Sequence, residues 1–513
     1  MTAVDGLAPG AATATAPSED PARLPRFAAK EVAIVTAAFV LVEMAVAARY
    51  GLHRDELYFL AGARHLAWGY VDQPPFVVVV ARLAVALFGA SAASLRVFAA
   101  LAGGATVVLT AAMARELRGG RRAQVVAAVA AATSAQVLAT THLLSTATFD
   151  LLAWAVISLL VLRALRTGDE RLWLAIGAAA GVGLLNKYNV LFLLFGLAVG
   201  LLASGRGDVF RRRWIWVGGA LALLIWSPNL VWNAQHDWAE LSMMQSLHRE
   251  NSTLSASLQF IPAQLLIVGP VLAPFWIAGL RRAFGHQVAR PFAFAYVTLL
   301  VVDVLTGAKP YYLGGIYFVL FAAGGVWLEE KARAGRARPR RWIALFVVGA
   351  IVGIPFTLPV LPDTMLAKSD WQGQINKDLS ATVGWPTFVR QVAGIASTLP
   401  ASERARLVVI TGDYGAAGAV DLYGGHYGLP RAISGHNSYW WWGTHGASDH
   451  STAIAVNMSR GELLRVFSDV ERAGAVGMGH GGVWTEERGE PIWICRGQRE
   501  SWSKAWPAMR QYG

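Results

Sequence analysis

Long apolar runs separated by short polar loops fill the chain up to about residue 360. Runs of roughly 17–20 apolar residues are typical of membrane-spanning helices, because a helix of that length crosses the hydrocarbon core of a bilayer. The pattern predicts spans near residues 31–50, 95–114, 123–141, 148–165, 172–185, 189–204, 214–231, 263–280, 291–306, 312–328 and 342–360. We therefore expect a mainly α, polytopic membrane protein with about eleven transmembrane helices.

The segment 76–90 is an apolar run whose placement depends on the charges around it. It is short, contains Arg82 and follows the pair Pro74-Pro75. If it crossed the bilayer, the later basic loops would face the side opposite to the basic N-terminal segment. If it lies along the outer surface instead, all the basic loops face the cytoplasm, namely 115–122, 163–171, 206–213, 281–290 and 331–341. The positive-inside rule favours the second arrangement. It predicts an interfacial helix over 76–90, a cytoplasmic N-terminus and an external C-terminus.

Composition agrees with a protein that lies mostly in lipid. Hydrophobic residues make up 55% of the chain and charged residues only 15%, whereas soluble domains carry about 25% charged residues. The net charge of +12 comes from short clusters between spans, so it indicates contact with membrane lipids and argues against a nucleic-acid partner. The single cysteine, Cys495, excludes an intrachain disulfide and a cysteine-based metal site.

Two terminal regions differ from the apolar middle of the chain. Residues 1–30 begin with an Ala/Pro/Thr-rich stretch and are predicted to be a disordered cytoplasmic N-terminus. Residues 31–361 form the expected transmembrane domain. Residues 362–513 contain no further apolar span, and strand-like runs at 406–412 and 452–456 flank a helix-like run at 416–423. We expect a small extracytoplasmic α/β domain over 362–513.

The pair Asp55-Glu56 follows the first span and would lie at the outer membrane surface. A carboxylate there could act as a general base for an incoming hydroxyl or amine, or the two could hold a divalent cation through oxygen ligands. The alternative is a solvated loop pair, or charges that interact favourably with the N-terminus of a helix.

Further polar residues gather on the same predicted face. Asp150 begins a span, where an acid would be costly without a role in a site, although it could simply be an N-terminal helix charge. Lys187 and Lys309 lie in outer turns and could bind a phosphate leaving group, or Lys187 could extend toward lipid phosphates. His236, beside Asp237, is a candidate for proton transfer or metal binding, with a structural hydrogen bond as the alternative.

These residues together resemble the GT-C superfamily of integral membrane glycosyltransferases, in particular protein O-mannosyltransferases and bacterial lipid A aminoarabinose transferases. The stretches that carry the resemblance cover roughly residues 31–330, and they are Asp55-Glu56 with Tyr58, Asp72-Gln73-Pro74-Pro75-Phe76, the basic turn 115–122, Asp150, Gly183–Tyr188, and Lys309-Pro310-Tyr311-Tyr312. The tail, from Asp413–Ala419 to Ile433–Asn437, is similar to that of bacterial family 39-like transferases.

The resemblance implies an enzyme that transfers a hexose or pentose from a polyprenyl-phosphate-linked donor to an acceptor outside the cytoplasmic membrane, with inversion. The acceptor would be an envelope glycan, a lipid or a protein. It further implies that Asp55 is the base or the residue that orients the acceptor, that Glu56 is its neighbour or a metal ligand, and that Asp150 is a second acid. The substrate-binding residues would be Lys187, Tyr188, Lys309, Tyr311, Tyr312, Asp72 and His236.

Two other functions compete with this interpretation. A transporter or flippase of lipid-linked substrates would usually show internal pseudo-symmetry and broken helices in matching halves, and the sequence shows no such repeat. A non-catalytic envelope assembly protein could keep the fold without the chemistry. Asp55-Glu56 and Lys187 argue against that alternative.

Overall fold

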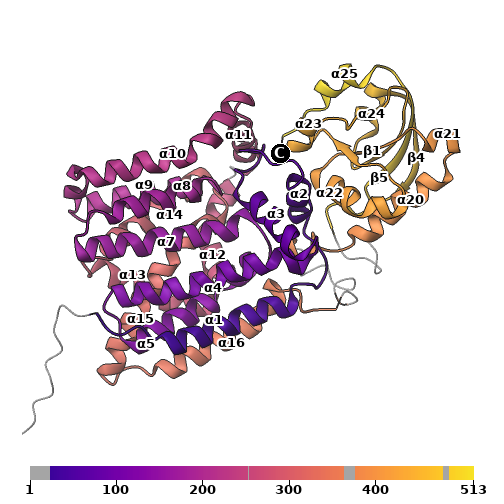
Figure 1. Ribbon diagram of the computed structural model, residues 1–513. Coiled ribbons are helices and arrows are strands. Elements are labelled where there is room, and N and C mark those ends of the chain that lie inside the picture. Colours follow the sequence, from indigo (N-terminus) through magenta and orange to yellow (C-terminus); the bar gives the residue numbers. More distant parts are fainter. Residues whose placement is uncertain (1–23, 252–253, 363–364, 366–375, 478–484, 513) are drawn as a thin grey trace, which may run out of the picture.

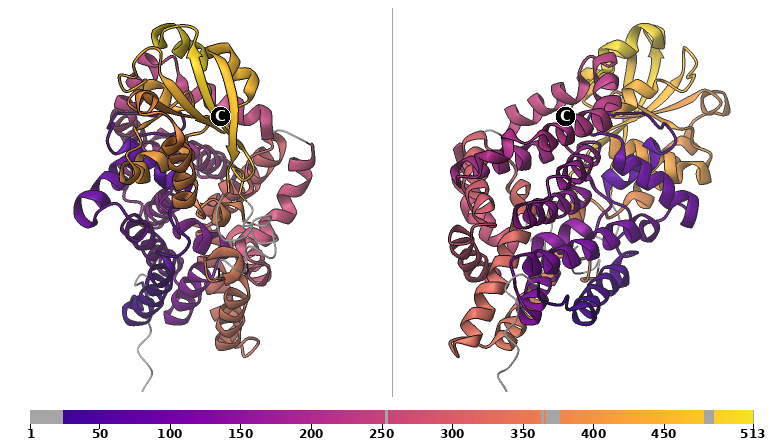
Figure 2. Two further views of the ribbon diagram at one scale, coloured as in Figure 1. Left: turned by 90° about the vertical axis from the view of Figure 1, so that its right-hand side faces the viewer. Right: turned by 60° about the vertical axis from the view of Figure 1, so that its left-hand side comes forward.

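The computed structural model describes residues 24–251, 254–362, 365, 376–477 and 485–512 (Figure 1). The prediction of a disordered N-terminus therefore falls mostly on residues 1–23, which lie outside the described residues. A large helical part is followed by a smaller part built around a β-sheet, which packs against one end of the helices (Figures 1 and 2). The domain boundary at residues 361 and 362 remains a prediction.

The helical part contains most of the helices in the structure. In chain order they are α1 (Ala29–Val46), α2 (Arg54–Gly62), α3 (Phe76–Phe88), α4 (Ala92–Glu116), α5 (Arg121–Ala132), α6 (Ala135–Thr141), α7 (Thr146–Thr167), α8 (Leu172–Leu184), α9 (Asn189–Ala203), η1 (Gly207–Arg211), α10 (Arg213–Gln235), α11 (Ala239–Asn251), α12 (Leu254–Val268), η2 (Pro270–Leu272), α13 (Ala273–Phe284), α14 (Arg290–Thr306), η3 (Pro310–Ile316), α15 (Tyr317–Arg333) and α16 (Pro339–Thr357).

Several of these helices are long and apolar enough to cross a membrane, which confirms a multi-pass membrane protein. Among the described residues, five helices meet the length and hydropathy requirement: α4, α7, α10, η3 with α15, and α16. The number rises to seven if each of two bent pairs counts as one span, and α3, α8 and α9 are shorter apolar helices. The predicted count of eleven is therefore not confirmed. The segment 76–90 is helical over 13 residues, too few to span a bilayer.

Breaks in two predicted spans have local causes. The predicted span 123–141 bends by 57° between α5 and α6, where Thr133 and Ser134 interrupt the helix. The predicted span 263–280 bends by 91° between α12 and α13, where Gly269 adopts φ +110° immediately before Pro270. Glycine accepts this backbone conformation without steric cost, and proline cannot donate the backbone hydrogen bond that a continuing helix needs.

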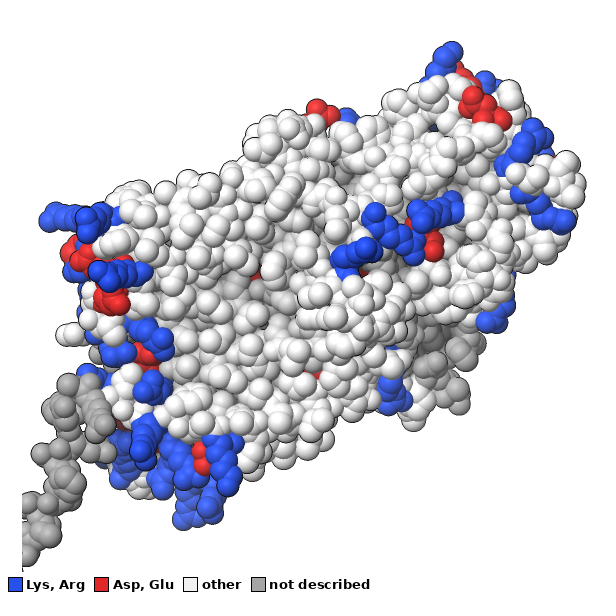
Figure 3. All heavy atoms as spheres, viewed as in Figure 1, with Lys and Arg blue, Asp and Glu red and all other residues white. Residues whose placement is uncertain are grey.

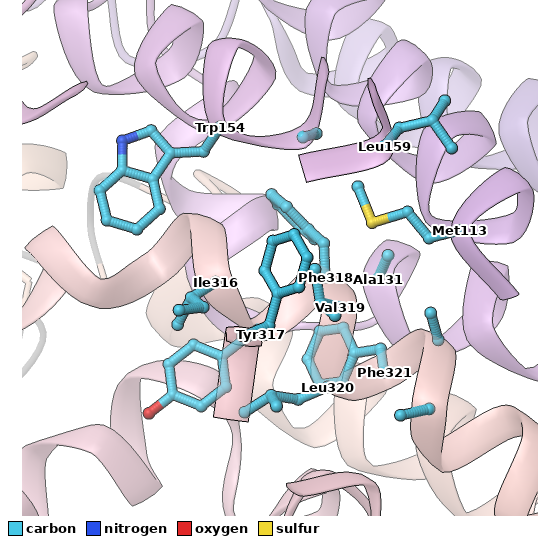
Figure 4. Packing of buried hydrophobic residues seen from close by; sticks show 14 of the residues in the cluster. Met113, Ala131, Trp154, Leu159, Ile316, Tyr317, Phe318, Val319, Leu320 and Phe321 are labelled. Carbon is cyan, nitrogen blue, oxygen red and sulfur yellow. The ribbon is translucent and has the colours of Figure 1, made fainter. Parts of the chain in front are cut away.

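The helices pack closely through small residues and a dense aromatic core. A side chain at Gly177 would collide with the backbone of Gly218, so α8 and α10 approach each other almost backbone to backbone. Such close approach is how transmembrane helices gain packing energy without a hydrophobic driving force between them. In the centre, Trp154 of α7 and Tyr317 and Phe321 of α15 belong to one cluster of buried apolar residues, in which the Tyr317 and Phe321 ring centres lie 6.3 Å apart (Figure 4). This packing fixes the helix ends that carry the site.

The basic loops all lie at one end of the helical part. Hydrogen bonds link them to one another: Arg163 and Arg166 donate to Glu116, Arg212 donates to Glu170, the Gly120 backbone nitrogen donates to Glu329, and Arg282 donates to Glu330. Figure 3 shows lysines and arginines concentrated at that end, with a wide band almost free of charge between them and the sheet-containing part. The structure thus confirms that the basic loops share one face, as the positive-inside argument requires.

The second part contains one five-stranded sheet in the order β2-β1-β3-β5-β4. The strands β1 (Leu407–Thr411), β2 (Ala432–Ser434) and β3 (Thr452–Val456) are parallel, whereas β5 (Pro491–Gln498) is antiparallel to both β3 and β4 (Phe467–Ala475). The apolar, buried runs of β1 and β3 are typical of strands covered on both faces. The small sheet agrees with the expected α/β fold of this region.

Short helices surround the sheet and connect it to the helical part. They are α19 (Lys377–Ser380), α20 (Trp385–Thr398), α21 (Ala401–Arg404), α22 (Tyr414–Tyr423), η4 (Gly424–Tyr427), α23 (Ser438–Trp442), α24 (Arg460–Val466), α25 (Trp502–Ala505) and η5 (Trp506–Met509). Helix α22 follows β1 directly and packs against α2 (Figure 1). The carboxyl ends of the parallel strands are thereby brought to the end of the helical part opposite the basic loops.

Candidate functional site

Asp55 lies in the first turn of the short helix α2. The side chain of His53 caps this helix by accepting a hydrogen bond from the Asp55 backbone nitrogen, and the Glu56 carboxylate accepts one from the His53 nitrogen. This reciprocal capping satisfies two backbone donors that would otherwise be unpaired. The Asp55 side chain stays 38% exposed, so the cap presents a partly accessible carboxylate at the junction with the sheet-containing part.

Charged and polar neighbours keep Asp55 ionised. Burial alone would raise the pKa of Asp55, but the neighbouring His53, Arg54, the Tyr414 hydroxyl and Lys309 together outweigh burial and lower the pKa below its usual value. Tyr414 donates a hydrogen bond of 2.8 Å to Oδ1 of Asp55. At neutral pH the carboxylate is therefore available as a hydrogen-bond and proton acceptor.

Glu56 points away from Asp55 and into the protein. Its side chain is fully buried and forms a two-point ion pair with Arg96 of α4, with Nε–Oε1 and Nη2–Oε2 distances of 3.1 and 2.9 Å. It also accepts hydrogen bonds from the backbone nitrogens of His53 and Leu144. All these contacts are structural, so the geometry favours Glu56 as a residue that holds α2 in place over its predicted role as a catalytic or metal-binding neighbour.

Asp72 is a second carboxylate close to Asp55. The Tyr58 hydroxyl donates a hydrogen bond of 2.9 Å to Asp72 Oδ1, and the same hydroxyl accepts one from the backbone nitrogen of Ser438. Burial, followed by the fields of Asp55 and Glu240, raises the pKa of Asp72 to about 7, although the Tyr58 hydrogen bond opposes the increase. Asp72 can therefore exchange a proton near neutral pH, next to a carboxylate that stays ionised.

Lys187 and the tyrosine pair predicted to bind substrate do meet in the structure. The Lys187 ammonium lies 4.9 Å from the ring centre of Tyr311 and 5.0 Å from that of Tyr312, which is cation–π geometry. Lys309 stands close by, and burial together with the neighbouring Lys187 lowers its pKa. In the described part of the chain, neither lysine has a carboxylate within ion-pair distance. Two ammonium groups without a paired acid form a suitable place for a phosphate.

Asp150 is buried and belongs to the same region. Its Oδ2 accepts a hydrogen bond of 2.8 Å from Asn189, whose amide also donates to the backbone oxygen of Tyr312. Asn189 thus ties the start of α7 to the segment that carries the tyrosine pair. This placement suits a role for Asp150 in orienting the segment around Lys187. The Asp150 side chain itself is buried from solvent.

Tyr188 faces a different polar network from Lys187. Its hydroxyl donates to Oδ1 of Asn229 at 2.6 Å, and Asn229 donates in turn to the Glu240 carboxylate at 3.0 Å. Burial raises the pKa of Glu240 to about 7, partly offset by its hydrogen bonds. This network fixes the end of α10 and the start of α11 beside the site.

The structure gives His236 packing contacts. Its ring stacks on Trp232 at 4.0 Å between centres, meets the edge of Trp441 at 4.7 Å, and lies 2.8 Å from the Trp232 backbone oxygen. Asp237, its expected partner, is exposed and pairs with Arg510 instead. His236 therefore joins the end of α10 to the sheet-containing part, which favours the structural alternative over proton transfer.

The possible divalent cation finds no support in this arrangement. Glu56 and Asp55 point in different directions, and Glu56 is already saturated by its hydrogen bonds. Within the ranges that the structure describes, no three His, Cys, Asp or Glu side chains are grouped as metal ligands. The residues present therefore do not fit a metal site.

Sequence reasoning overlooked three residues of this region. Arg96 was detectable, because an arginine inside an apolar span needs a buried partner. Glu240 follows the end of an apolar run but carries no distinctive pattern. Tyr414 lay in the tail that resembled family 39-like transferases, yet only the tertiary structure brings it to Asp55.

Comparison with known proteins finds similarity to membrane glycosyltransferases. A family model described as dolichyl-phosphate-mannose-protein mannosyltransferase matches residues 72–232. Lipid A galacturonosyltransferase RgtD of Rhizobium johnstonii is 31% identical over 138 residues, which cover 26% of this chain and 29% of the relative. The match thus spans less than a third of that protein.

Solved structures match over nearly the whole chain. The crystal structure of ArnT from Cupriavidus metallidurans in the apo state superposes with a TM-score of 0.60 at 15% identity, covering 91% of this chain and 98% of ArnT. The same protein bound to undecaprenyl phosphate gives a TM-score of 0.58 at 15% identity, with 91% and 97% covered. The predicted resemblance to the GT-C superfamily is therefore confirmed at the level of the fold.

Proposed function

We propose that this protein is a glycosyltransferase that takes a sugar from a polyprenyl-phosphate-linked donor and transfers it to an acceptor at the outer surface of the cytoplasmic membrane. The observation that carries the proposal is the convergence of a partly exposed, ionised Asp55 with Lys187 and Lys309, which have no carboxylate within ion-pair distance among the described residues. A base and a phosphate-binding pair are the two elements that such a transfer needs.

Asp55 serves the acceptor. Its carboxylate orients an acceptor hydroxyl and takes the proton of that hydroxyl as the new glycosidic bond forms. Glu56 and Asp150 are buried, whereas the Asp55 side chain is 38% exposed, so Asp55 can meet a substrate. A single base acting on the acceptor supports direct displacement with inversion at the sugar carbon.

Lys187 and Lys309 serve the donor. Negative charge develops on the lipid phosphate as the bond to the sugar breaks, and fixed cations stabilise that charge most strongly in the transition state. The rings of Tyr311 and Tyr312 hold the Lys187 ammonium in place. The uncharged band below this end of the molecule suits a prenyl chain running along apolar helices (Figure 3).

Membrane orientation follows from the charge distribution. The basic loops occupy the end of the helical part opposite Asp55 and Lys187, and basic loops face the cytoplasm in most membrane proteins. We therefore place the N-terminus inside, and the site and the sheet-containing part outside. Whether the sugar is a hexose or a pentose depends on contacts with the sugar itself.

Donor cleavage by the purified protein tests the proposal. Wild-type protein in nanodiscs is incubated with an envelope extract as the acceptor source and a panel of undecaprenyl-phosphate hexoses and pentoses, and released undecaprenyl phosphate is measured. Asp55→Asn keeps the size and removes the base, so the rate should fall by about 10²–10⁴. Asp169→Asn, an exposed acid among the basic loops, is the control and should keep full activity.

The outcome separates the competing functions. Full turnover by folded Asp55→Asn protein would remove Asp55 from the reaction. A transporter would move the lipid-linked sugar between leaflets and release no undecaprenyl phosphate from any donor. Either result would end the proposal in its present form.

A further inference from the structure

We infer that Tyr414 is a positioning residue for Asp55, so that the sheet-containing part supplies one wall of the active site. The inference rests on the proposed function, because it assigns Tyr414 a role through the proposed base. Its starting observation is the hydrogen bond of 2.8 Å from the Tyr414 hydroxyl to Asp55 Oδ1, which joins residues 359 positions apart in sequence.

The turn before Tyr414 is built to hold that side chain in one place. Asp413 caps α22 by accepting a hydrogen bond from the Ala416 nitrogen, and its other oxygen accepts one of 2.6 Å from Asn457 at the end of β3. A side chain at Gly412 would collide with the Asn457 backbone oxygen, so only glycine allows the two strand ends to come this close. The β1–α22 turn is thus fixed by its neighbour in the sheet.

Two other aromatic rings contact the Tyr414 ring. It lies 5.1 Å from the His436 ring in stacked geometry, and its backbone nitrogen donates to His436 Nδ1. The centre of the Tyr58 ring lies 4.8 Å from the centre of the Tyr414 ring. Burial, and next the Asp55 carboxylate, raises the pKa of the Tyr414 phenol well above its usual value. The hydroxyl therefore keeps its proton and acts only as a donor.

Two glycines of α22 let this helix pack closely against α2. A Cβ at Gly415 would lie 2.8 Å from the Arg54 Cβ, and one at Gly418 would lie 2.9 Å from the Leu57 backbone carbon. Ser438 adds a second connection, because its nitrogen donates to the Tyr58 hydroxyl and its Oγ accepts from the Val71 nitrogen. The two parts are therefore joined on both sides of Asp55.

This contact distinguishes the two oxygens of the Asp55 carboxylate. Oδ1 is engaged by Tyr414, whereas Oδ2 lies 3.8 Å from His53 Nδ1, too far for a hydrogen bond. Among the described residues, no donor lies within hydrogen-bond distance of Oδ2. The geometry thus points Oδ2 at the acceptor, with Tyr414 preventing the carboxylate from rotating and favouring its ionised form.

The test removes the hydroxyl alone. Tyr414→Phe keeps the ring and its packing, so the protein should fold and bind undecaprenyl phosphate with unchanged affinity. Loss of one hydrogen bond to a charged group should lower kcat/KM by about 10–100-fold. The acidic limb of the pH profile of kcat/KM should also move to higher pH, because the ionised carboxylate has lost a donor.

Two further variants complete the experiment. Tyr427→Phe changes an exposed tyrosine just beyond the same helix and should match wild type. Gly418→Ala pushes α22 away from α2 while keeping Tyr414, and it should produce the same shift of the acidic limb.

The possible results separate the inference from the proposed function. If Tyr414→Phe keeps wild-type kcat/KM and an unchanged acidic limb while Asp55→Asn is inactive, Tyr414 has no positioning role and the proposed function survives. A loss of rate in Tyr414→Phe without any shift of the limb would equally overturn the inference, because a purely structural effect does not act through the Asp55 proton. If Asp55→Asn is fully active, the proposed base itself is wrong.

Discussion

Glu56 offers a direct way to separate a positioning role from a catalytic one. Its carboxylate is fully buried, and its partner Arg96 is 2% exposed. Besides Glu56, the Arg96 guanidinium donates to the backbone oxygens of Ala47 and Gly51 at 2.7 and 2.6 Å. One arginine thus connects the end of α1, the segment before α2 and the first turn of α2 itself.

The substitution Glu56→Gln removes the charge and keeps the shape. It leaves Arg96 as a buried cation without the carboxylate that it pairs with, and breaking a buried pair in this way costs about 3–5 kcal/mol. Glutamine keeps one acceptor oxygen, so we expect a value of about 3 kcal/mol, near the lower end of that range. Each 1.4 kcal/mol is about a factor of ten in an equilibrium, so local opening of α2 should become roughly 100-fold more frequent.

Hydrogen exchange in nanodiscs measures this opening directly. Peptides covering residues 53–62 should become about 100-fold less protected from exchange in Glu56→Gln. Donor cleavage should fall only by the fraction of molecules in which α2 is open, because Asp55 is carried by the same helix. Glu116→Gln is the matched control. Glu116 is also buried and pairs with Arg163 and Arg166, but at the opposite end of the molecule, so α2 protection and activity should stay unchanged.

The opposite pattern would refute the reasoning. If Glu56→Gln keeps wild-type protection of α2 but loses turnover, Glu56 acts on substrate or a metal ion, as the sequence had suggested. A double-mutant cycle with Arg96→Met gives a second check. The two single substitutions should not be additive, because each removes the same interaction.

Three further predictions concern the donor site, the buried acid at the start of α11, and the membrane orientation. Lys187→Ala should abolish most donor cleavage, and Lys187→Arg should restore part of it, since arginine keeps the charge with a different geometry. Lys309→Ala should also lower donor cleavage. Unchanged donor affinity and turnover in Lys187→Ala would exclude a phosphate contact. Glu240, whose pKa is raised from 4.5 to about 7, binds a proton more tightly in the folded state, so its contribution to stability is complete below pH 4.5 and is lost as the pH rises through 7. Thermal unfolding should therefore show Glu240→Gln stabilised by about 3 kcal/mol at pH 8 and unchanged at pH 4, and equal melting temperatures at pH 8 would contradict the raised pKa. A cysteine label at Gly119 should react only from the cytoplasmic side and one at Gly425 only from outside, in a Cys495→Ser background; external labelling of Gly119 would reverse the orientation of the whole site.

Local patterns were sufficient for the features that depend on neighbouring residues. The apolar runs of α4, α7, α10 and α16 determine long helices wherever they pack, because helix periodicity and the cost of exposing backbone in lipid act within each segment. The basic loops belong together for the same reason, since one rule places each of them on the same side. Asp55 and Lys187 could be predicted as site residues because polar residues at the ends of spans stand out against apolar surroundings.

Tertiary structure decided the features that depend on distant parts of the chain. Asp55 and Glu56 are neighbours in sequence, yet successive residues on a helix point about 100° apart, so only the position of α4 determines that Glu56 meets Arg96 and Asp55 stays accessible. Only the packing of α22 on α2 brings Tyr414 to Asp55. Such contacts form through the close fit of side chains from several elements, and no periodicity or charge pattern within one segment records that fit.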